Sequence, residues 1–117
     1  MLSALSSALS GLSAFTKQIG TAAHNTANAN TAGFKKSRVV LEETRPQGVQ
    51  ARIETINTPG PLLLTRTQEG DSLVEQSNVD IAEEAVAMIL AKRAYQANLS
   101  TLKAEVERRG SLLDIIE

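Results

Sequence analysis

The sequence contains no cysteine and a single histidine, His24. The absence of cysteine excludes disulfide bonds, thiolate zinc sites and a cysteine nucleophile. One histidine leaves no second imidazole for a proton relay or a paired metal site. Glycine-rich phosphate loops and a Ser-His-Asp arrangement are also missing from the sequence. These absences predict a protein that is not an enzyme and that binds no metal or cofactor.

Aromatic side chains are scarce too: the 117 residues include Phe15, Phe34 and Tyr95 but no tryptophan. A compact globular core usually contains more of them, so packing of long helices through Leu, Ile, Val and Ala is the better expectation. The longest uninterrupted apolar run is Ala85–Ala91, far shorter than the roughly 20 residues of a membrane-spanning helix. We therefore expect a mostly helical protein without a membrane span.

Charge of neither sign dominates, because 12 Lys and Arg residues stand against 13 Asp and Glu residues. No segment is basic enough to indicate a nucleic-acid partner. The first 30 residues contain one base, Lys17, and no acid, and their leucines are interleaved with serines. A secretory signal peptide has a basic start and a continuous apolar stretch. We therefore expect any export to proceed without a cleaved signal of that type.

Both ends of the chain repeat apolar residues at alternating intervals of three and four, a pattern typical of coiled-coil helices. The simplest interpretation is that the two helices pair within one chain and bury a shared seam. Two helices alone bury little apolar surface, so the alternative is that several copies also pack together. The repeating residues are Leu2, Leu5, Leu9, Leu12 and Ile19 at the N-terminal end, and Ile81, Met88, Tyr95, Leu99, Leu102, Val106 and Leu113 at the C-terminal end.

The segment between these two stripes loses the helical period. Residues 38–41 and 49–56 have the composition of short strands, and Pro, Gln and Gly at 46–48 provide a turn between them. Residues 62–65 fit a third strand or an extended arm, and a second turn follows at 68–71. The middle of the chain is therefore expected to be β-rich or extended.

The start of the C-terminal helix is marked by Ser77, Asn78 and Asp80, any of which can cap it. The whole pattern predicts a mostly α fold in which long N- and C-terminal helices pair as a coiled coil, with a small β-rich or extended segment between them. The expected parts are an N-terminal coiled-coil helix over 1–30, a short β-hairpin or extended segment over 31–76, and a C-terminal coiled-coil helix over 77–117.

The densest polar feature is a corner in which Asn25, Asn28 and Asn30 are followed by Gly33 and Phe34. Asparagine and glycine favour turns and left-handed backbone conformations. The first interpretation is therefore a helix C-cap with a turn. A polar contact between subunits is the second interpretation, and a catalytic asparagine is the weakest of the three.

Two runs of the sequence resemble signatures of the bacterial flagellar rod and hook proteins. The run N-T-A-N-A-N-T-A-G-F-K at 25–35 is similar to the N-terminal signature of that family. The run at 77–84, with its continuation at 88–98, is similar to the C-terminal signature. Both stand in the right order at opposite ends of the chain. The short middle segment resembles a proximal-rod member, because hook and distal-rod proteins carry large inserted domains.

The resemblance implies a structural axial subunit of the flagellar basal-body rod. Members of that family leave the cytoplasm through the flagellar type III export apparatus without a cleaved signal. They polymerise through their terminal helices into a tube that crosses the periplasm and transmits torque. The implied partners are further copies, other rod and hook axial proteins, and the export apparatus. A soluble helical adaptor or export chaperone of the flagellar system is the alternative, although it would not explain the two signatures.

An assembly interface is expected from the two stripes and the asparagine corner. Burial of apolar stripes contributes more free energy than surface ion pairs, so we expect the stripes to set stability and the corner to set register. The expected interface residues are Leu2, Leu5, Leu9, Leu12, Ile19, Asn25, Asn28, Asn30, Gly33, Phe34, Asn78, Ile81, Met88, Tyr95, Leu99, Leu102, Val106 and Leu113.

Overall fold

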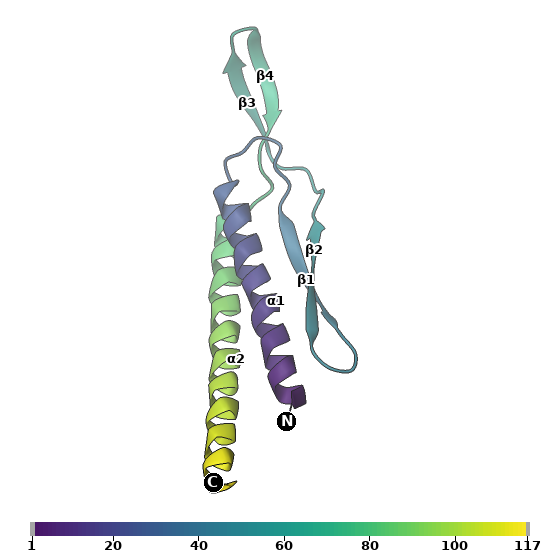
Figure 1. The fold of residues 1–117 in the computed structure, drawn as a ribbon. Helices are drawn as coiled ribbons and strands as arrows, with labels where there is room; N and C mark the ends of the chain where they lie inside the picture. The colour runs from purple at the N-terminus through teal and green to yellow at the C-terminus, as the bar shows by residue number, and fades with distance from the viewer. Residues whose placement is uncertain (1, 117) are drawn as a thin grey trace.

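A computed structural model describes residues 2–116 of the chain. Two long helices, α1 (Leu2–Ala27) and α2 (Ile81–Ile116), lie side by side and run in opposite directions (Figure 1). Four strands in the connecting segment form two separate two-stranded antiparallel hairpins. The expected fold is confirmed: the terminal helices are in contact, and the segment between them contains small sheets.

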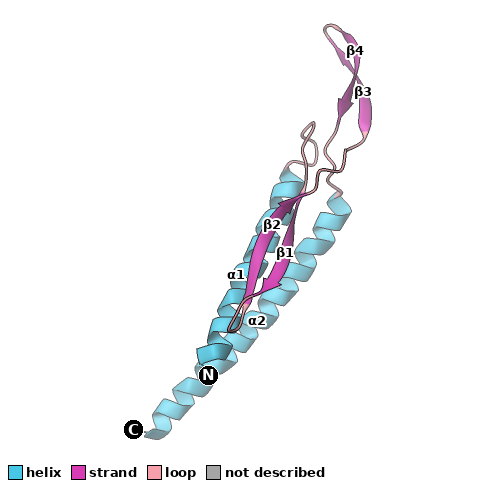
Figure 2. Ribbon diagram, turned by 90° about the vertical axis from the view of Figure 1, so that its right-hand side faces the viewer, coloured by secondary structure: helices cyan, strands magenta, loops and turns pink. Residues whose placement is uncertain are grey.

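The first hairpin lies along the helix pair (Figure 2). It consists of β1 (Ser37–Glu43) and β2 (Val49–Thr55), joined by the turn predicted at 46–48. The backbone N–H of Val49 donates to Ser10 Oγ of α1 at 3.1 Å. The side chain of Ala51 is buried. These contacts attach the first hairpin to α1.

The second hairpin projects beyond one end of the helix pair (Figure 1). It consists of β3 (Leu62–Thr67) and β4 (Gly70–Glu75), and Leu64 lies opposite Leu73 in its register. The expected strand at 62–65 and the turn at 68–71 are confirmed. The pattern did not predict β4, so the pairing of the 62–65 strand into a second hairpin was not expected.

Asp80 is the residue that caps α2. Its Oδ1 accepts hydrogen bonds from the backbone N–H of Ala82 at 2.8 Å and of Glu83 at 3.4 Å, which satisfies donors that lack a partner at the start of a helix. Ser77 Oγ instead accepts from the N–H of Val79. Of the three capping candidates, Asp80, the acid next to the helix, is therefore the one that caps α2.

The buried apolar residues between these elements are small. At one point the helices approach so closely that a Cβ at Gly11 would collide with the side-chain amide of Asn98. None of the large aliphatic or aromatic side chains that the structure describes is fully buried. The buried apolar residues are Ala8, Ala14, Ala22, Ala51 and Ala91.

The molecule is long and narrow, with extents of 80 × 24 × 18 Å. Its radius of gyration is 20.8 Å, against about 13 Å for a compact domain of similar length. Its accessible surface is 8222 Å², whereas a folded monomer of this mass exposes roughly 6,200 Å². The chain therefore leaves much more surface open than an ordinary monomeric domain does.

Candidate functional site

The asparagine corner joins three elements through Asn25, whose side chain is 1% exposed. Its Nδ2 donates to the carbonyl of Ser37 at 2.7 Å and to Glu84 Oε1 at 3.0 Å. Its Oδ1 accepts from the N–H of Ser37 at 2.9 Å. Asn25 therefore ties the end of α1 to the start of β1 and to the first turns of α2.

The rest of the corner forms the predicted helix end and turn. Asn28 Nδ2 donates to the carbonyl of His24 at 2.9 Å, and Asn28 Oδ1 accepts from Thr31 at 3.2 Å. Gly33 has a φ of 69°, in the left-handed region. The side chain of Asn30 is exposed. The first interpretation, a helix C-cap with a turn, is confirmed.

Phe34 closes this corner against α1. Its ring meets that of His24 edge to face, with centroids 5.5 Å apart and an interplanar angle of 64°. Aromatic pairs favour this geometry. The ring contact holds the chain as it leaves the turn toward β1.

A polar neck fixes the second hairpin to this corner. Lys35 forms an ion pair with Glu75, and the same carboxylate accepts from the N–H of Gly60 at 2.9 Å. The hydrogen bond from Lys35 and then that from the Gly60 amide hold the pKa of Glu75 below its usual range. The N–H of Gly33 also donates to the Glu75 carbonyl at 2.9 Å. The ion pair and the hydrogen bonds at Glu75 therefore fix the direction in which the second hairpin projects.

Asn78 contributes to the neck from the other side. Its Oδ1 accepts from the N–H of Lys36 at 2.6 Å. Its Nδ2 donates to the carbonyls of Ile56 and Thr58, both at 2.8 Å. This side chain, expected at an interface, thus links the segments before β1 and after β2 within the chain.

The predicted leucine stripes do not form the buried contact between α1 and α2. Ala8 and Gly11, which precede Leu9 and Leu12, are buried instead. Successive side chains point about 100° apart around a helix axis. The stripe residues therefore face sideways rather than directly toward the partner helix. Leu9, at 51%, Ile81, Val106 and Leu113 are more than half exposed. The half-buried stripe residues are Leu5, Leu12, Ile19, Met88, Tyr95, Leu99 and Leu102; the side chain of Leu2 lies outside the described part of the chain.

Both stripes lie on the same side of the helix pair. Gly11 faces Asn98, and the next residue in each helix, Leu12 and Leu99, belongs to a stripe. Ser10, one residue before Gly11, bonds to β2. In two antiparallel helices, the residues that each follow a contact residue by one position point to the same side of the helix pair. The stripes therefore form one apolar face opposite the first hairpin, which we call the stripe face.

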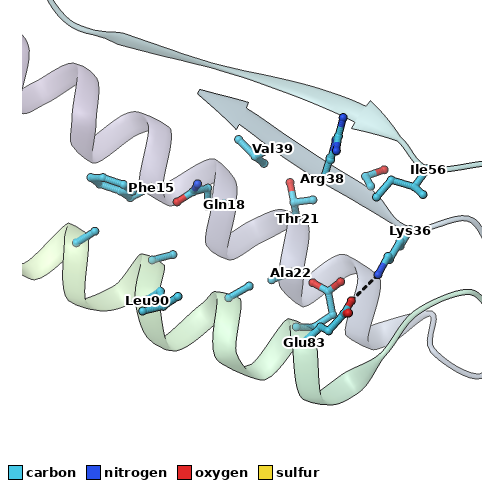
Figure 3. Close-up of a pocket in the computed structure, with 15 residues that line it drawn as sticks. Phe15, Gln18, Thr21, Ala22, Lys36, Arg38, Val39, Ile56, Glu83 and Leu90 are labelled. Carbon is cyan, nitrogen blue, oxygen red and sulfur yellow. Dashed lines mark hydrogen bonds and ion pairs between the residues drawn. The ribbon is translucent and has the colours of Figure 1, made fainter. Parts of the chain in front are cut away.

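A groove of about 480 Å³ lies on the other side, between α1, β1 and α2. Phe15, Val39 and Leu90 contribute apolar walls, and Lys36 and Glu83 form an ion pair of 2.6 Å at its edge (Figure 3). Within residues 2–116, no group of three His, Cys, Asp or Glu side chains could hold a metal ion. The groove is therefore a hollow with apolar walls and an ion pair at its edge.

The small residues of the helix contact were not among the predicted interface residues. A signal for them exists in the sequence, since Ala8 and Ala22 are 14 residues, or two heptads, apart and Gly11 follows Ala8 by three. This second heptad was hidden because leucines carry a stronger apolar signal than alanine or glycine. Buried Glu84 had no such signal.

Comparison with protein families matches both ends of the chain. Residues 5–35 match the family described as Flagella basal body rod protein. Residues 71–115 match the family described as Flagellar basal body rod FlgEFG protein C-terminal. A search of the curated proteins found no match.

The two matched segments correspond to the structural elements in the order that the sequence predicted. The first contains most of α1 and the asparagine corner, and the second contains most of β4 and nearly all of α2. No helix within residues 2–116 has the length and apolarity needed to cross a membrane. Family membership implies a structural role and a location in the basal-body rod, with assembly alongside rod proteins. The chain belongs to the flagellar basal body rod protein family, whose members are structural and not enzymes.

Proposed function

We propose that this chain is an axial subunit that polymerises through α1 and α2 and transmits torque along the rod. We further propose that it leaves the cytoplasm through the flagellar type III export apparatus without a cleaved signal. The family supplies the structural rod role. The observation that carries the polymerisation is the stripe face, which presents large apolar side chains to solvent on one side of the helix pair.

Burial of the stripe face provides the driving force for assembly. Covering a large aliphatic side chain contributes about 1.5–3 kcal/mol, and Leu9, Ile81, Val106 and Leu113 are all more than half exposed. An exposed ion pair such as Arg38–Glu54 contributes about 0–1 kcal/mol. Apolar contact therefore outweighs surface charge in holding subunits together.

The weak core of the single chain fits export in an unfolded state. Its buried apolar side chains are all alanines, and each of these loses little apolar contact when the chain unfolds. The ordering of a chain costs free energy that burial must exceed. Assembly supplies the missing burial, so the subunit is expected to become stable where it is incorporated.

The test combines fractionation with one substitution. Intact hook–basal bodies are purified from cells that carry the chain, and mass spectrometry compares them with the cytosol. We expect the wild-type chain to be enriched in basal bodies. Leu99→Glu places a charge on the stripe face, so we expect loss of incorporation and of motility. Gln96→Glu, on an exposed position of the same helix outside the stripe, is the matched control.

Two outcomes would count against the proposal. Detection of the wild-type chain in the cytosol alone would favour the adaptor or chaperone alternative. Normal incorporation and motility of the Leu99→Glu variant would remove the stripe face from the assembly contacts.

A further inference from the structure

The β3–β4 hairpin carries an apolar face that none of the described residues 2–116 covers. Side chains alternate along a strand, and Leu64 pairs with Leu73, so Leu62, Leu64 and Leu73 share one face. These three side chains are between 62% and 67% exposed. An isolated two-stranded hairpin is marginally stable in water. The hairpin therefore needs a partner for this face, which we call the hairpin face.

The neck holds the hairpin in a set direction. Lys35, Gly33 and Gly60 all bond to Glu75 at the end of β4. The N–H of Gln76 donates to the carbonyl of Pro61 at 2.8 Å. The views in Figures 1 and 2 both show the hairpin extending past the helix ends. An arm that is both apolar and oriented is suited to docking.

A complementary surface lies on the back of α2. Val86, Ile89 and Leu90 are more than half exposed. Ile89 and Arg93 stand two residues from buried Ala91 on either side, which turns them about 160° away from the contact with α1. We call Val86, Ile89, Leu90 and Arg93 the outer face of α2. It lies on neither the stripe face nor the contact with α1, and Leu90 forms its edge toward the groove.

The charges of the two surfaces are opposite. The outer face of α2 carries the base Arg93. The acid Glu83, which lines a hollow with Val86 and Leu90, is already paired with Lys36. The tip of the hairpin contains Glu69 and Asp71 beside a single base, Arg66. Arg66 lies 3.6 Å from Asp71 and is almost fully exposed. Within residues 2–116, Glu69 and Arg93 take part in no ion pair. Each surface therefore offers a charge that the other can satisfy.

The two surfaces also match in length. Val86 and Arg93 are seven residues apart on a helix, about 10 Å along its axis. Asp71 pairs with Arg66, which lies four residues after Leu62 along β3. This corresponds to about 13 Å along the strand. Three leucines can therefore meet three aliphatic side chains while the acidic tip reaches Arg93.

We propose that the hairpin face of one copy docks on the outer face of α2 of a second copy. Leu62, Leu64 and Leu73 cover the aliphatic side chains there, and Glu69 and Asp71 meet Arg93. The contact joins two different surfaces, so it is heterologous and can repeat along a filament. This inference rests on the proposed function, which brings copies together, and it adds a contact distinct from the stripe face.

Cysteine cross-linking tests this contact, because the natural chain contains no cysteine. A chain carrying both Leu73→Cys and Ile89→Cys is expressed in cells that make rods, and the purified basal bodies are oxidised. We expect a ladder of disulfide-linked dimers, trimers and larger species. Each single variant should yield no dimer. Addition of Arg93→Glu should reduce the cross-linked yield about tenfold, because like charges then face each other.

Matched controls separate this contact from others. Leu73→Cys with Ile115→Cys places the second thiol at an even more exposed aliphatic position of α2; a ladder of equal yield there would overturn the proposed partner surface. Dimers formed by Leu73→Cys alone would overturn it in favour of two hairpins stacked face to face. Purified single variants, mixed and oxidised in solution, provide the second measurement, and the expected product is the mixed dimer.

The same preparation distinguishes this inference from the proposed function. Mass spectrometry first determines whether the wild-type chain is present in basal bodies. Its absence there would contradict the proposed function. Its presence, with no ladder from the double variant in either basal bodies or solution, would overturn the hairpin contact and leave the rod function standing.

Discussion

Asn25 shows how one amide can hold three elements together. It lies at the end of α1, where α2 and the start of β1 also meet, and its side chain bonds to Ser37 and Glu84. The hydrogen bonds satisfy a polar group that is costly to bury alone. A helix pair lined with alanines lacks large side chains that could fix its register, so this polar contact specifies how the ends align.

We expect Asn25→Ala to lower the free energy of unfolding by about 1–3 kcal/mol, because Glu84 and the Ser37 backbone would lose buried partners. Urea denaturation of the purified chain, followed by circular dichroism, measures the change. Asn28→Ala is the control, since Asn28 bonds only to residues of its own turn. Equal losses in both variants would contradict the special role of Asn25.

Replacement by alanine should change the stability of the chain in opposite directions at two glycines. A Cβ at Gly60 would collide with the backbone carbonyl of Gln76, whereas one at Gly20 would meet nothing within 4 Å. We expect Gly60→Ala to lower the thermal midpoint of the chain. Gly20→Ala should raise stability by about 0.5–1 kcal/mol, because alanine favours a helix interior. A stabilising Gly60→Ala would show that the neck is looser than described.

At the scale of elements, the sequence predicted the helices and the first hairpin well. Intervals of three and four define a helix, and a turn at 46–48 between β-favouring runs defines a hairpin. The strand β4 was missed because Gly70–Glu75 has no clear alternation and follows a turn signal. β4 pairs with β3 through backbone hydrogen bonds. Such bonds do not require a particular side-chain pattern, so the sequence shows no signal for them.

The contact between α1 and α2 could not be read from the same periodicity. A period identifies an apolar face but does not say which partner covers it. Here the leucine stripes face sideways from the helix pair, and Ala8, Gly11 and Ala91 make the close contact. The apolar stripes were therefore predictable as sets of residues, while their orientation relative to the partner helix required the structure.

The neck of the second hairpin should depend on pH. Lys35 and the Gly60 amide hold the pKa of Glu75 below its usual range. A carboxyl group with a lowered pKa contributes stability above its unfolded pKa of about 4.3, and this contribution is lost as the pH falls through the folded pKa. We expect the hairpin to loosen in acid, as measured by the NMR shift of the Gly60 amide proton.

Glu75→Gln is the matched variant for this titration, because glutamine keeps the shape but has no charge. The Gly60 shift should then change little as the pH falls from neutral to well below the unfolded carboxyl pKa of about 4.3. An unchanged acid transition in the variant would assign the effect to another carboxyl group, such as Glu54 or Glu105, whose pKa values are also lowered by neighbouring arginines.

At the scale of the whole molecule, the shape and the core have one common explanation. The chain is elongated, with a radius of gyration of 20.8 Å, and its core consists of alanines. Its large aliphatic side chains therefore stay at or near the surface. Exposed apolar patches of this kind mark interaction sites. The stripe face, the hairpin face and the outer face of α2 are separate, so one subunit can contact several neighbours.

We expect assembly to add stability to α1. In the free chain, one side of this helix lacks a partner, and helices draw most of their stability from packing. Amide hydrogen exchange over residues 3–25 should therefore be faster in the free chain than in assembled rods. Equally slow exchange in both states would show that α1 is already fully stabilised within the single chain.

The central claim is that the exposed leucines of the stripe face stabilise the assembly rather than the single chain, and Leu9→Glu tests it most directly. We predict that the purified variant changes its free energy of unfolding by no more than about 0.5 kcal/mol, as an exposed position allows, while its incorporation into rods is lost. Ser13→Glu, exposed on the same helix beyond the stripe, should be incorporated normally. A Leu9→Glu chain that unfolds, or one that enters rods as the wild type does, would contradict the claim.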